Sequence, residues 1–319
     1  MRKVWRLLPV FWLVFGVIFA CVSYSGYDLL QRAGRNAEQM THQIEPKETS
    51  QKRIEQKSKE ATYDTDQIKP VTPEEFAAAQ LKYEKIVNQW GIGAIYIPGA
   101  DIRTKILAGM DNQNLMVGVG TYYPNQQLGK GNYVVLAHNL VQGGGPLGNI
   151  PQTALHQIFY ATDFSTVFEY TAVKNDIVSA SAGELLDIPK EDERPLMTLI
   201  RCEGGINTVN RAVLQGTFVK SYPAEKASME VKLGLGLIEQ KSIVVDAEIP
   251  QSTSGEETSI EVKQGNTKKE SPQIYSFFQE LCIHCFLLLN THPIESGIGY
   301  LLGMFLLSHL AIWKQKSEY

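Results

Sequence analysis

Residues 196–219 read LMTLIRCEGGINTVNRAVLQGTFV, and this stretch decides the fold. Two β-rich runs, 196–202 and 211–219, flank a loop that holds glycines and asparagines. If the runs pair as antiparallel strands through this loop, the end of the first lies beside the start of the second. The stretch therefore predicts a strand pair that brings Cys202 next to Arg211.

Similar short runs come before this pair, each bounded by Gly, Pro, Asn or Asp. They are GAIYIP, TKILAG, NYVVLAHN, QIFYA, VFEYTAV and DIVSAS. Strands at this spacing, with almost no helical period between them, indicate an all-β barrel or sandwich. Residues 72–90 precede the strands and predict a helix, because Thr72 suits the N-cap and Pro73 the first helical position.

The N-terminal end of the chain is apolar. Residues 7–24 carry no charge and are long enough to span about 30 Å of hydrocarbon as a helix. Arg2, Lys3 and Arg6 precede them, so the positive-inside rule places the N-terminus in the cytoplasm. A cleaved signal peptide is the rival interpretation. We favour an uncleaved anchor because no small-x-small site closes the apolar run.

The C-terminal end contains two further apolar stretches. Residues 297–313 lead into Lys314 and Lys316 and predict a second transmembrane helix that ends in the cytoplasm. Residues 274–289 include charged and polar side chains and predict an interfacial or partly inserted helix. A hairpin of two spans would put the terminal lysines outside, which the positive-inside rule disfavours.

The segments just inside the two ends are polar, and 25–72 predicts a mostly solvated stalk that can be helical in part. The chain then divides into a cytoplasmic tip and anchor (1–24), the stalk (25–72), a β domain (73–249), a polar linker (250–273) and a C-terminal hydrophobic region with a short basic tail (274–319). We expect a cell-membrane protein whose β domain is extracellular. The net charge of -4 and the lack of a basic stripe argue against a nucleic-acid partner.

The four cysteines are unevenly placed. Cys21, Cys282 and Cys285 lie in or beside the apolar terminal segments, where packed thiols are the ordinary interpretation. Cys202 is the only cysteine of the β domain, so that domain cannot contain a disulfide. A lone thiol in an extracytoplasmic domain is either inert in the core or reactive.

A thiol nucleophile must become a thiolate, and its usual partner is a histidine. The β domain offers two, His138 and His156. His138 ends the predicted strand NYVVLA and opens a loop, and Cys202 is placed in the same way. Strand ends at loops commonly present reactive groups. His156 occupies an ordinary polar position beside QIFYA, so we prefer His138.

Acyl transfer also needs a group that stabilises the negative oxygen developing on the carbonyl. Arg211 is the candidate because the predicted strand pair brings it beside Cys202, although a surface role is the alternative. Arg201 is adjacent in sequence, but neighbouring side chains in a strand point to opposite faces. The candidate catalytic residues are thus His138, Cys202 and Arg211, and we expect no cofactor or metal site.

Taken in chain order, these features resemble the sortases, membrane-anchored cysteine transpeptidases of Gram-positive bacteria. The resemblance covers residues 88–220 and rests on GAIYIP, NLMVGVGTYYP, GNYVVLAHN, TLIRC and RAVLQGTF in this order. Two positions depart from the family pattern. Arg201 replaces a threonine of the signature before the cysteine, and Ala137 replaces a glycine that is common before the histidine. Neither departure removes a reacting group, but the arginine leaves the rate and motif preference open.

The resemblance implies a closed eight-stranded β-barrel with an N-terminal helix, flanked by transmembrane helices. It implies that Cys202 attacks the Thr–Gly carbonyl of an LPxTG-type sorting signal and forms a thioester acyl-enzyme. An amine, typically of the peptidoglycan precursor lipid II, then resolves the thioester. His138 would be the acid/base partner, and Arg211 would hold the carbonyl and its oxyanion. The expected partners are LPxTG-bearing surface proteins, lipid II and membrane lipid.

The resemblance leaves the subclass open. The N-terminal helix and the lack of an Asp-Pro-aromatic lid motif resemble the housekeeping class A, whereas a C-terminal span is typical of the pilin-polymerising class C. Another thiol hydrolase is disfavoured by the order His before Cys and by the β pattern. A non-enzymatic, membrane-tethered β domain with an inert Cys202 is the remaining alternative.

Two loop segments allow further interpretations. Asp187, Glu191, Asp192 and Glu193 are acidic, like the calcium-binding loops of some sortases, but a solvated loop is the ordinary interpretation. Residues 150–154, IPQTA, resemble a sorting signal and would act as a pseudosubstrate if they occupied the groove. A turn with chance similarity is the ordinary interpretation of that segment.

Overall fold

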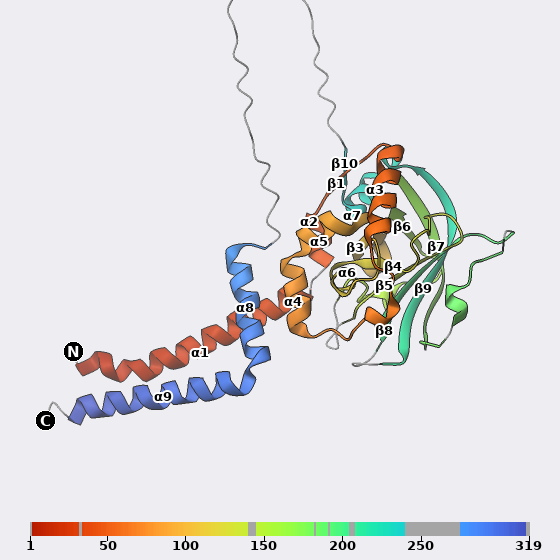
Figure 1. Cartoon of the computed structure of the whole chain (residues 1–319). Coiled ribbons are helices and arrows are strands. Elements are labelled where there is room, and N and C mark those ends of the chain that lie inside the picture. Colours follow the sequence, from red (N-terminus) through yellow and green to blue (C-terminus); the bar gives the residue numbers. More distant parts are fainter. Residues whose placement is uncertain are drawn as a thin grey trace, which may run out of the picture.

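Eight strands close into a barrel in the computed structural model, which describes residues 2–31, 34–139, 145–181, 183–190, 192–203, 208–239 and 275–316 (Figure 1). Around the barrel the strands follow the order β2-β3-β4-β5-β8-β9-β7-β6. They are β2 (Gly91–Ile97), β3 (Ile102–Leu107), β4 (Val119–Thr121), β5 (Asn132–Ala137), β6 (Ile158–Thr162), β7 (Thr166–Ser179), β8 (Leu196–Glu203) and β9 (Asn210–Pro223). The predicted closed barrel is therefore confirmed, and a sandwich is excluded.

Strand β7 joins two runs that the sequence presents as separate strands. Polar residues Lys174 and Asn175 divide the runs in sequence, yet both residues pair with β9. The β7–β9 ladder shifts its register between Glu169 and Tyr170 and again just before Lys174. Bulges of this kind bend a strand and increase its twist, which lets one long strand follow the curve of the barrel.

Alternate residues of each strand fill the barrel interior, as the two-residue period of a strand requires. The interior residues of β5 and β8 are Tyr133, Val135, Ala137, Met197 and Leu199. These residues are odd-numbered on both strands. The even-numbered residues of β5 and β8 therefore lie on the outer face of the sheet.

Helices cover parts of the barrel exterior, so the chain as a whole is not all-β as expected. They are α3 (Lys47–Glu60), α4 (Pro73–Leu81), α5 (Tyr83–Trp90), α6 (Asn112–Val117) and α7 (Met229–Leu235). Thr72 and Glu75 form a capping box at the start of α4, which confirms the predicted helix start. Helices α6 and α7 have only six and seven residues, so they are too short to show a helical period in the sequence.

Residues 25–31 continue α1, and much of 34–72 packs against the barrel, so these described residues do not form the solvated stalk that we expected for 25–72. Within them lie α2 (Gly34–Gln39), α3 and β1 (His42–Gln43), and β1 pairs in parallel with β10 (Leu237–Ile238). Arg53 of α3 donates hydrogen bonds to the carbonyl oxygens of Gly91 and Asp163 and forms an ion pair with Glu45. Polar side chains make many of these contacts, so the segment lacks an apolar period.

The terminal helices α1 (Arg2–Gln31) and α9 (Pro293–Lys316) lie side by side and run in opposite directions, so both chain ends lie at the same end of the pair (Figure 1). Trp12 stacks on Tyr300, and each of these side chains donates a hydrogen bond to the backbone carbonyl oxygen of the other residue. Helix α8 (Phe277–Thr291) contacts both α1 and α4.

Of the helices that the structure describes, one, Leu7–Leu30, is long and apolar enough to cross a membrane. A signal sequence near the N-terminus would meet the same criterion. The second predicted span, residues 297–313, does not meet it, so two flanking transmembrane helices are not confirmed. The predicted linker, 250–273, lies outside the described residues.

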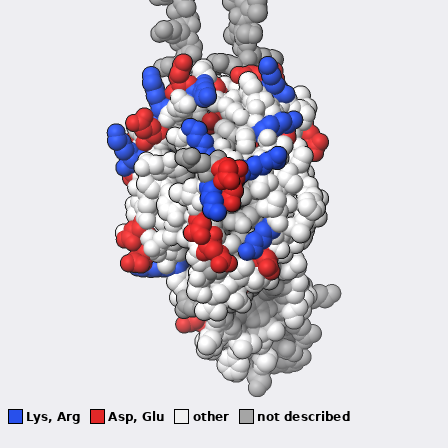
Figure 2. Space-filling model, turned by 90° about the vertical axis from the view of Figure 1, so that its right-hand side faces the viewer, with Lys and Arg blue, Asp and Glu red and all other residues white. Residues whose placement is uncertain are grey.

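Charged side chains of both signs are intermixed on the face shown in Figure 2. On this face the described residues form no large patch of one sign. The distribution agrees with the small net charge of -4. This face therefore offers no basic surface of the kind that binds the phosphates of nucleic acids.

Candidate active site

Cys202 and Arg211 form a residue pair in the antiparallel ladder between β8 and β9. Strand β8 also pairs in parallel with β5, and the last pair of that ladder joins Ala137 to Arg201. His138 follows β5 directly, so it stands one step further along, level with Cys202. Because neighbouring strands are about 4.8 Å apart, the three predicted residues meet at one end of three adjacent strands.

The side chains of Cys202 and Arg211 share the outer face of the sheet. A small apolar cluster, separate from the barrel core, lies on these three strands. It consists of Val134 on β5, Ile200 on β8 and Val213 on β9, packed with Leu185. Ile200 is two positions from Cys202, and Val213 is two positions from Arg211. Side chains two positions apart on a strand point to the same face. Cys202 and Arg211 therefore stand at the end of an apolar strip on the outside of the barrel, and His138 follows β5 at the same end of the sheet.

The other end of the apolar strip is held by a group of polar side chains. Thr198 Oγ1 donates a hydrogen bond to Asn132 Oδ1 at 2.7 Å and accepts one from Gln215 Nε2 at 3.0 Å. Asn132 Nδ2 donates to the carbonyl oxygens of Leu185 and Asp187. These bonds fix the segment before β8 against the sheet, where it forms one wall of the strip.

His138 is buried, with 7% of its surface exposed. Burial lowers the pKa of its imidazole from 6.5 to about 4, and the charge of Glu75 has a smaller effect in the opposite direction. The ring is therefore neutral at pH 7. Its Nε2 lies 3.0 Å from Oδ1 of Asn112, and no hydrogen bond between His138 and Cys202 is present in the described part of the chain.

Asn112 fixes the tautomer of His138. Its Oδ1 accepts the backbone N–H of Lys69 at 3.1 Å, and its Nδ2 donates to the Lys69 carbonyl at 3.4 Å, so the orientation of the amide follows from its partners. An oxygen then faces His138, whose Nε2 must carry the proton. Nδ1 is left as the proton acceptor. The sequence gives no signal for this contact, because Asn112 is 26 residues from His138.

Arg211 is anchored at the start of β9. Its Nη1 donates hydrogen bonds to the carbonyl oxygens of Thr208 at 2.8 Å and Asn210 at 2.9 Å. A guanidinium has five N–H donors, so this anchoring leaves others to meet a carbonyl oxygen beside Cys202. Cys202 itself is a free thiol of intermediate exposure.

The two departures from the family pattern are accommodated away from the apolar strip. Arg201 is buried, its Nη2 lies 2.8 Å from Glu203 Oε2, and its Nη1 donates to the carbonyl oxygen of Cys202 at 3.1 Å. Arg201 thus supports the backbone of Cys202 from the opposite face of β8, in agreement with strand alternation. The methyl group of Ala137 is buried in the barrel core.

His156 and the segment 150–154 lie away from the three candidate residues. His156 precedes β6, which β7 and β9 separate from β8 in the barrel order, and its N–H bonds to the carbonyl oxygen of Ala172. Ile150 begins a 3₁₀ turn, Ile150–Gln152, and is fully buried in the barrel core. A pseudosubstrate would lie on the outer face, so the burial of Ile150 and Thr153 favours a turn as the interpretation of 150–154.

The acidic segment before β8 makes mainly backbone contacts. The carbonyl oxygen of Asp187 accepts a hydrogen bond from Asn132, and Glu193 Oε2 accepts one from the N–H of Lys190. Glu191 lies outside the described residues. Where side chains are described, no group of three or more His, Cys, Asp and Glu residues is arranged to hold a metal ion.

A family model for the sortase domain matches residues 95–219. Sortase A of Listeria monocytogenes serovar 1/2a is 25% identical over 174 residues, which cover 54% of this chain and 74% of that protein. Sortase A of Streptococcus agalactiae serotype III is 29% identical over 175 residues, covering 53% of this chain and 70% of that protein. The Bacillus subtilis protein YwpE, itself assigned to the sortases, is 34% identical over 101 residues, or 31% of this chain and 93% of that protein.

Solved structures give a parallel comparison. The crystal structure of Listeria monocytogenes sortase A aligns with a TM-score of 0.41 at 25% identity, covering 46% of this chain and 97% of that one. Sortase E of Streptomyces avermitilis aligns with a TM-score of 0.38 at 24% identity, covering 44% of this chain and 96% of that one. Both alignments span nearly the whole of the solved chain and less than half of this one.

Proposed function

The chain belongs to the sortase family, and on this premise we propose that it is a membrane-anchored cysteine transpeptidase that uses His138, Cys202 and Arg211. Sortases are cysteine transpeptidases, and residues 73–249 contain no cysteine besides Cys202. The observation that supports the assignment is the strand register, in which Cys202 lies opposite Arg211 and at the same end of the sheet as His138.

In the first half-reaction, the sulfur of Cys202 attacks the threonine carbonyl carbon of an LPxTG-type sorting signal. Nδ1 of His138 accepts the thiol proton as the C–S bond forms. Arg211 donates N–H groups to the oxyanion, where a planar guanidinium is well suited. The C–N bond between Thr and Gly then breaks, His138 protonates the leaving amine, and a thioester remains on Cys202.

In the second half-reaction, a primary amine of a cell-wall precursor such as lipid II attacks the thioester. His138 removes a proton from the attacking nitrogen as the new C–N bond forms. The C–S bond then breaks, and His138 returns that proton to the sulfur of Cys202. The neutral imidazole that burial favours is the form that accepts a proton in both halves.

We place the barrel on the outer side of the membrane of a Gram-positive cell, where surface proteins emerge. The basic residues Arg2, Lys3 and Arg6 support a cytoplasmic N-terminus. The antiparallel packing of α9 on α1 supports a C-terminus on the same side and α9 as a second span. Large apolar side chains along α9 are exposed and are not covered by the other parts of the chain that the structure describes. They include Leu301, Leu302, Phe305, Leu306, Ile312 and Trp313.

A pilin-polymerising, class C-like sortase is the second candidate. The contact between α9 and α1 favours it, because a C-terminal anchor resembles that class. The segment before α4, however, lacks an Asp-Pro-aromatic lid motif. The relatives named sortase A support a housekeeping role as the first candidate.

The test uses the full-length chain in detergent micelles, a library of LPxTG-type peptides and a set of amines, with products read by mass spectrometry. We expect cleavage between Thr and Gly, a peptide adduct on Cys202, and a ligated product that requires an amine. Cys202→Ala should lose all three, whereas Cys21→Ala, the matched thiol control in α1, should lose none. A folded chain that forms no adduct with any peptide would favour the non-enzymatic alternative. Preferred transfer to a pilin lysine peptide would favour class C.

A further inference from the structure

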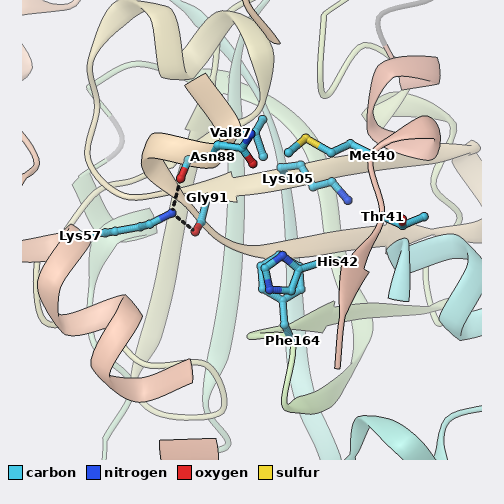
Figure 3. A pocket seen from close by; sticks show the side chains of 9 residues that line it. All are labelled: Met40, Thr41, His42, Lys57, Val87, Asn88, Gly91, Lys105 and Phe164. Atoms are coloured by element: carbon cyan, nitrogen blue, oxygen red, sulfur yellow. Dashed lines mark hydrogen bonds between the residues drawn. The ribbon is translucent and has the colours of Figure 1, made fainter. Parts of the chain in front are cut away.

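A pocket of about 50 Å³ lies between β3, α5 and the N-terminal segment that passes over them (Figure 3). Its lining includes Thr41, His42, Lys57, Asn88, Lys105 and Phe164. Thr41 and Asn88 are exposed, whereas Lys105 is buried. The pocket therefore opens at the surface, and the side chain of Lys105 forms its inner end. None of these residues belongs to the candidate active site.

Lys105 is a buried cation that has no partner in the described part of the chain. Only 2% of its surface is exposed, and no hydrogen bond or ion pair joins its Nζ to another described residue. Burial alone changes the pKa of this ammonium group, lowering it to about 8, with no contribution from a nearby carboxylate. In Figure 3 the side chain is directed into the pocket. An ammonium group buried without a counter-ion is costly, so the geometry calls for an anion beside Nζ.

The other charged groups around the pocket are already engaged. Lys57 Nζ donates hydrogen bonds to the carbonyl oxygens of Asn88 at 2.8 Å and Gly91 at 3.0 Å. The nearby carboxylate of Glu45 is shared by His42 Nε2 at 2.6 Å and Arg53 Nε at 3.1 Å. Glu45 therefore does not serve Lys105, and cations outnumber carboxylates around the pocket.

We propose that this pocket binds one small oxyanion, a phosphate group, with Lys105 Nζ as its principal ligand. Three features support that chemistry. The cavity is far smaller than the roughly 300–1,000 Å³ of a site for a drug-sized ligand, so it fits a single charged group. A lysine ammonium is an effective point charge for phosphate. The ring of His42, whose centroid lies 3.8 Å from that of the Phe164 ring, gives the pocket a rigid wall.

Two sources supply such a group, the headgroup of a membrane phospholipid and free phosphate. The pocket is close to the membrane anchor in the chain, because Leu30 ends the candidate span and Thr41 already lines the pocket. Eleven residues reach at most about 40 Å when fully extended, and helix α2 shortens this path. A lipid headgroup is thus within reach of the same site that would take the free ion.

The test measures the thermal unfolding midpoint of the full-length chain in detergent micelles that contain no phosphate. One arm adds sodium phosphate against sodium chloride at equal ionic strength, and the other adds phosphatidic acid against diacylglycerol. We expect one of the two phosphate-bearing additions to raise the midpoint by about 2–5 °C at saturation. A response to the ion alone identifies free phosphate as the source, and a response to the lipid alone identifies the headgroup.

Lys105→Met is the variant that decides the proposal, because it keeps the length of the side chain and removes its charge. It should abolish the phosphate-specific shift, whereas Lys85→Met, an exposed lysine on α5, should keep it. No shift in either arm, or an equal shift in Lys105→Met, overturns the proposal. If Lys105→Met does not fold, acylation of the wild-type lysines by acetic anhydride replaces it. Phosphate should then protect Lys105 and leave Lys85 reactive, and equal labelling with and without phosphate overturns the proposal.

Discussion

Cys202 and Arg211 occupy one residue pair of the β8–β9 ladder, so the sheet itself fixes the distance between them. Residues directly opposite each other in an antiparallel pair have Cβ atoms about 4.5–5.5 Å apart. His138 approaches from β5, the other neighbour of β8. Strand β8 thus carries the candidate nucleophile between a proton acceptor on one side and a cation on the other.

Replacing Arg211 tests the oxyanion role. Arg211→Ala should slow acylation by about 10²–10³-fold, the usual loss when an oxyanion donor is removed. Arg211→Lys keeps the charge but loses the planar fork, so it should also be impaired. Single-turnover formation of the peptide adduct measures both. Arg194→Ala removes an exposed arginine before β8 and is the matched control, and an equal loss in that variant would refute the assignment.

The two histidines of the barrel should differ sharply. His138→Ala should lower the rate of transpeptidation by on the order of 10²-fold or more, because acid/base catalysis contributes on that scale. His156→Ala should leave the rate within about a few-fold of wild type, since no proton-transfer role falls to this distant residue. Steady-state peptide cleavage measures the rates of both variants. A larger loss in His156→Ala than in His138→Ala would refute the assignment of His138.

Asn112 should act as a positioning residue through His138. Asn112→Ala should lower kcat by on the order of tenfold with little change in KM, since about 1.4 kcal/mol of imidazole positioning is lost. Asn112→Asp keeps the acceptor and adds a negative charge that raises the pKa of His138, so it should recover activity with a pH profile moved upward. Gln113→Ala, at the next and exposed position, is the control. A pH profile unchanged in Asn112→Asp would contradict the contact with His138.

Arg53 should stabilise the fold although it lies in a segment that looks like a stalk. Arg53→Ala leaves the carbonyl oxygens of Gly91 and Asp163 without this donor, and should lower the free energy of unfolding by about 2 kcal/mol. Chemical denaturation of the full-length chain measures the loss. Lys52→Ala, an exposed change on the same helix, should have almost no effect. Equal stability of the two variants would mean that α3 does not hold the barrel.

Lys105 should make stability depend on pH in the alkaline range. Its pKa is about 8 in the folded chain against 10.5 ordinarily, so between these values the unfolded chain holds a proton that the folded chain has lost. Stability should therefore rise with pH through this window, by up to about 3 kcal/mol. Lys105→Met should lack this contribution, and Lys85→Met should keep it. Unfolding midpoints of the three proteins at pH 7.5, about 9 and about 10 measure this pH dependence. Bound phosphate should reduce the pH dependence of the wild-type chain.

The short strands and the Cys202–Arg211 pair were predictable because they depend on local patterns of strand alternation and glycine-rich turns. The closed barrel was implied only by the resemblance to the sortases, and the parallel pairing that brings the end of β5 beside β8 has no local signal. The Cys202–Arg211 pair follows from one loop between two runs. The continuous β7 was not predictable, because polar residues on a bulged strand look like a turn in the sequence.

Contacts between distant polar residues could not be predicted. Asn112 reaches His138 only because α6 and Lys69 pack together, and neither carries a periodic signal. Helix α3 could not be predicted for the same reason. Its Arg53 and Lys57 side chains hold it to the barrel through hydrogen bonds to a backbone carbonyl oxygen, and not through an apolar stripe. Hydrophobic periodicity reports apolar burial, so it is silent about a helix that is held by hydrogen bonds.

Strand β9 is the last strand of the barrel in chain order, and it pairs with both β7 and β8. The barrel can therefore close only when β9 is present. A ribosome makes the chain from its N-terminus, and Cys202 therefore exists before Arg211 and before the rest of β9. Until residue 223 has been made, the barrel that carries the thiol cannot be complete, because strands that are far apart in the sequence can all pair only after the last strand exists. A nascent chain at this stage carries a chemically ordinary cysteine. Catalytic competence would arrive as a single late event in biosynthesis, and a chain that terminates early would be inert.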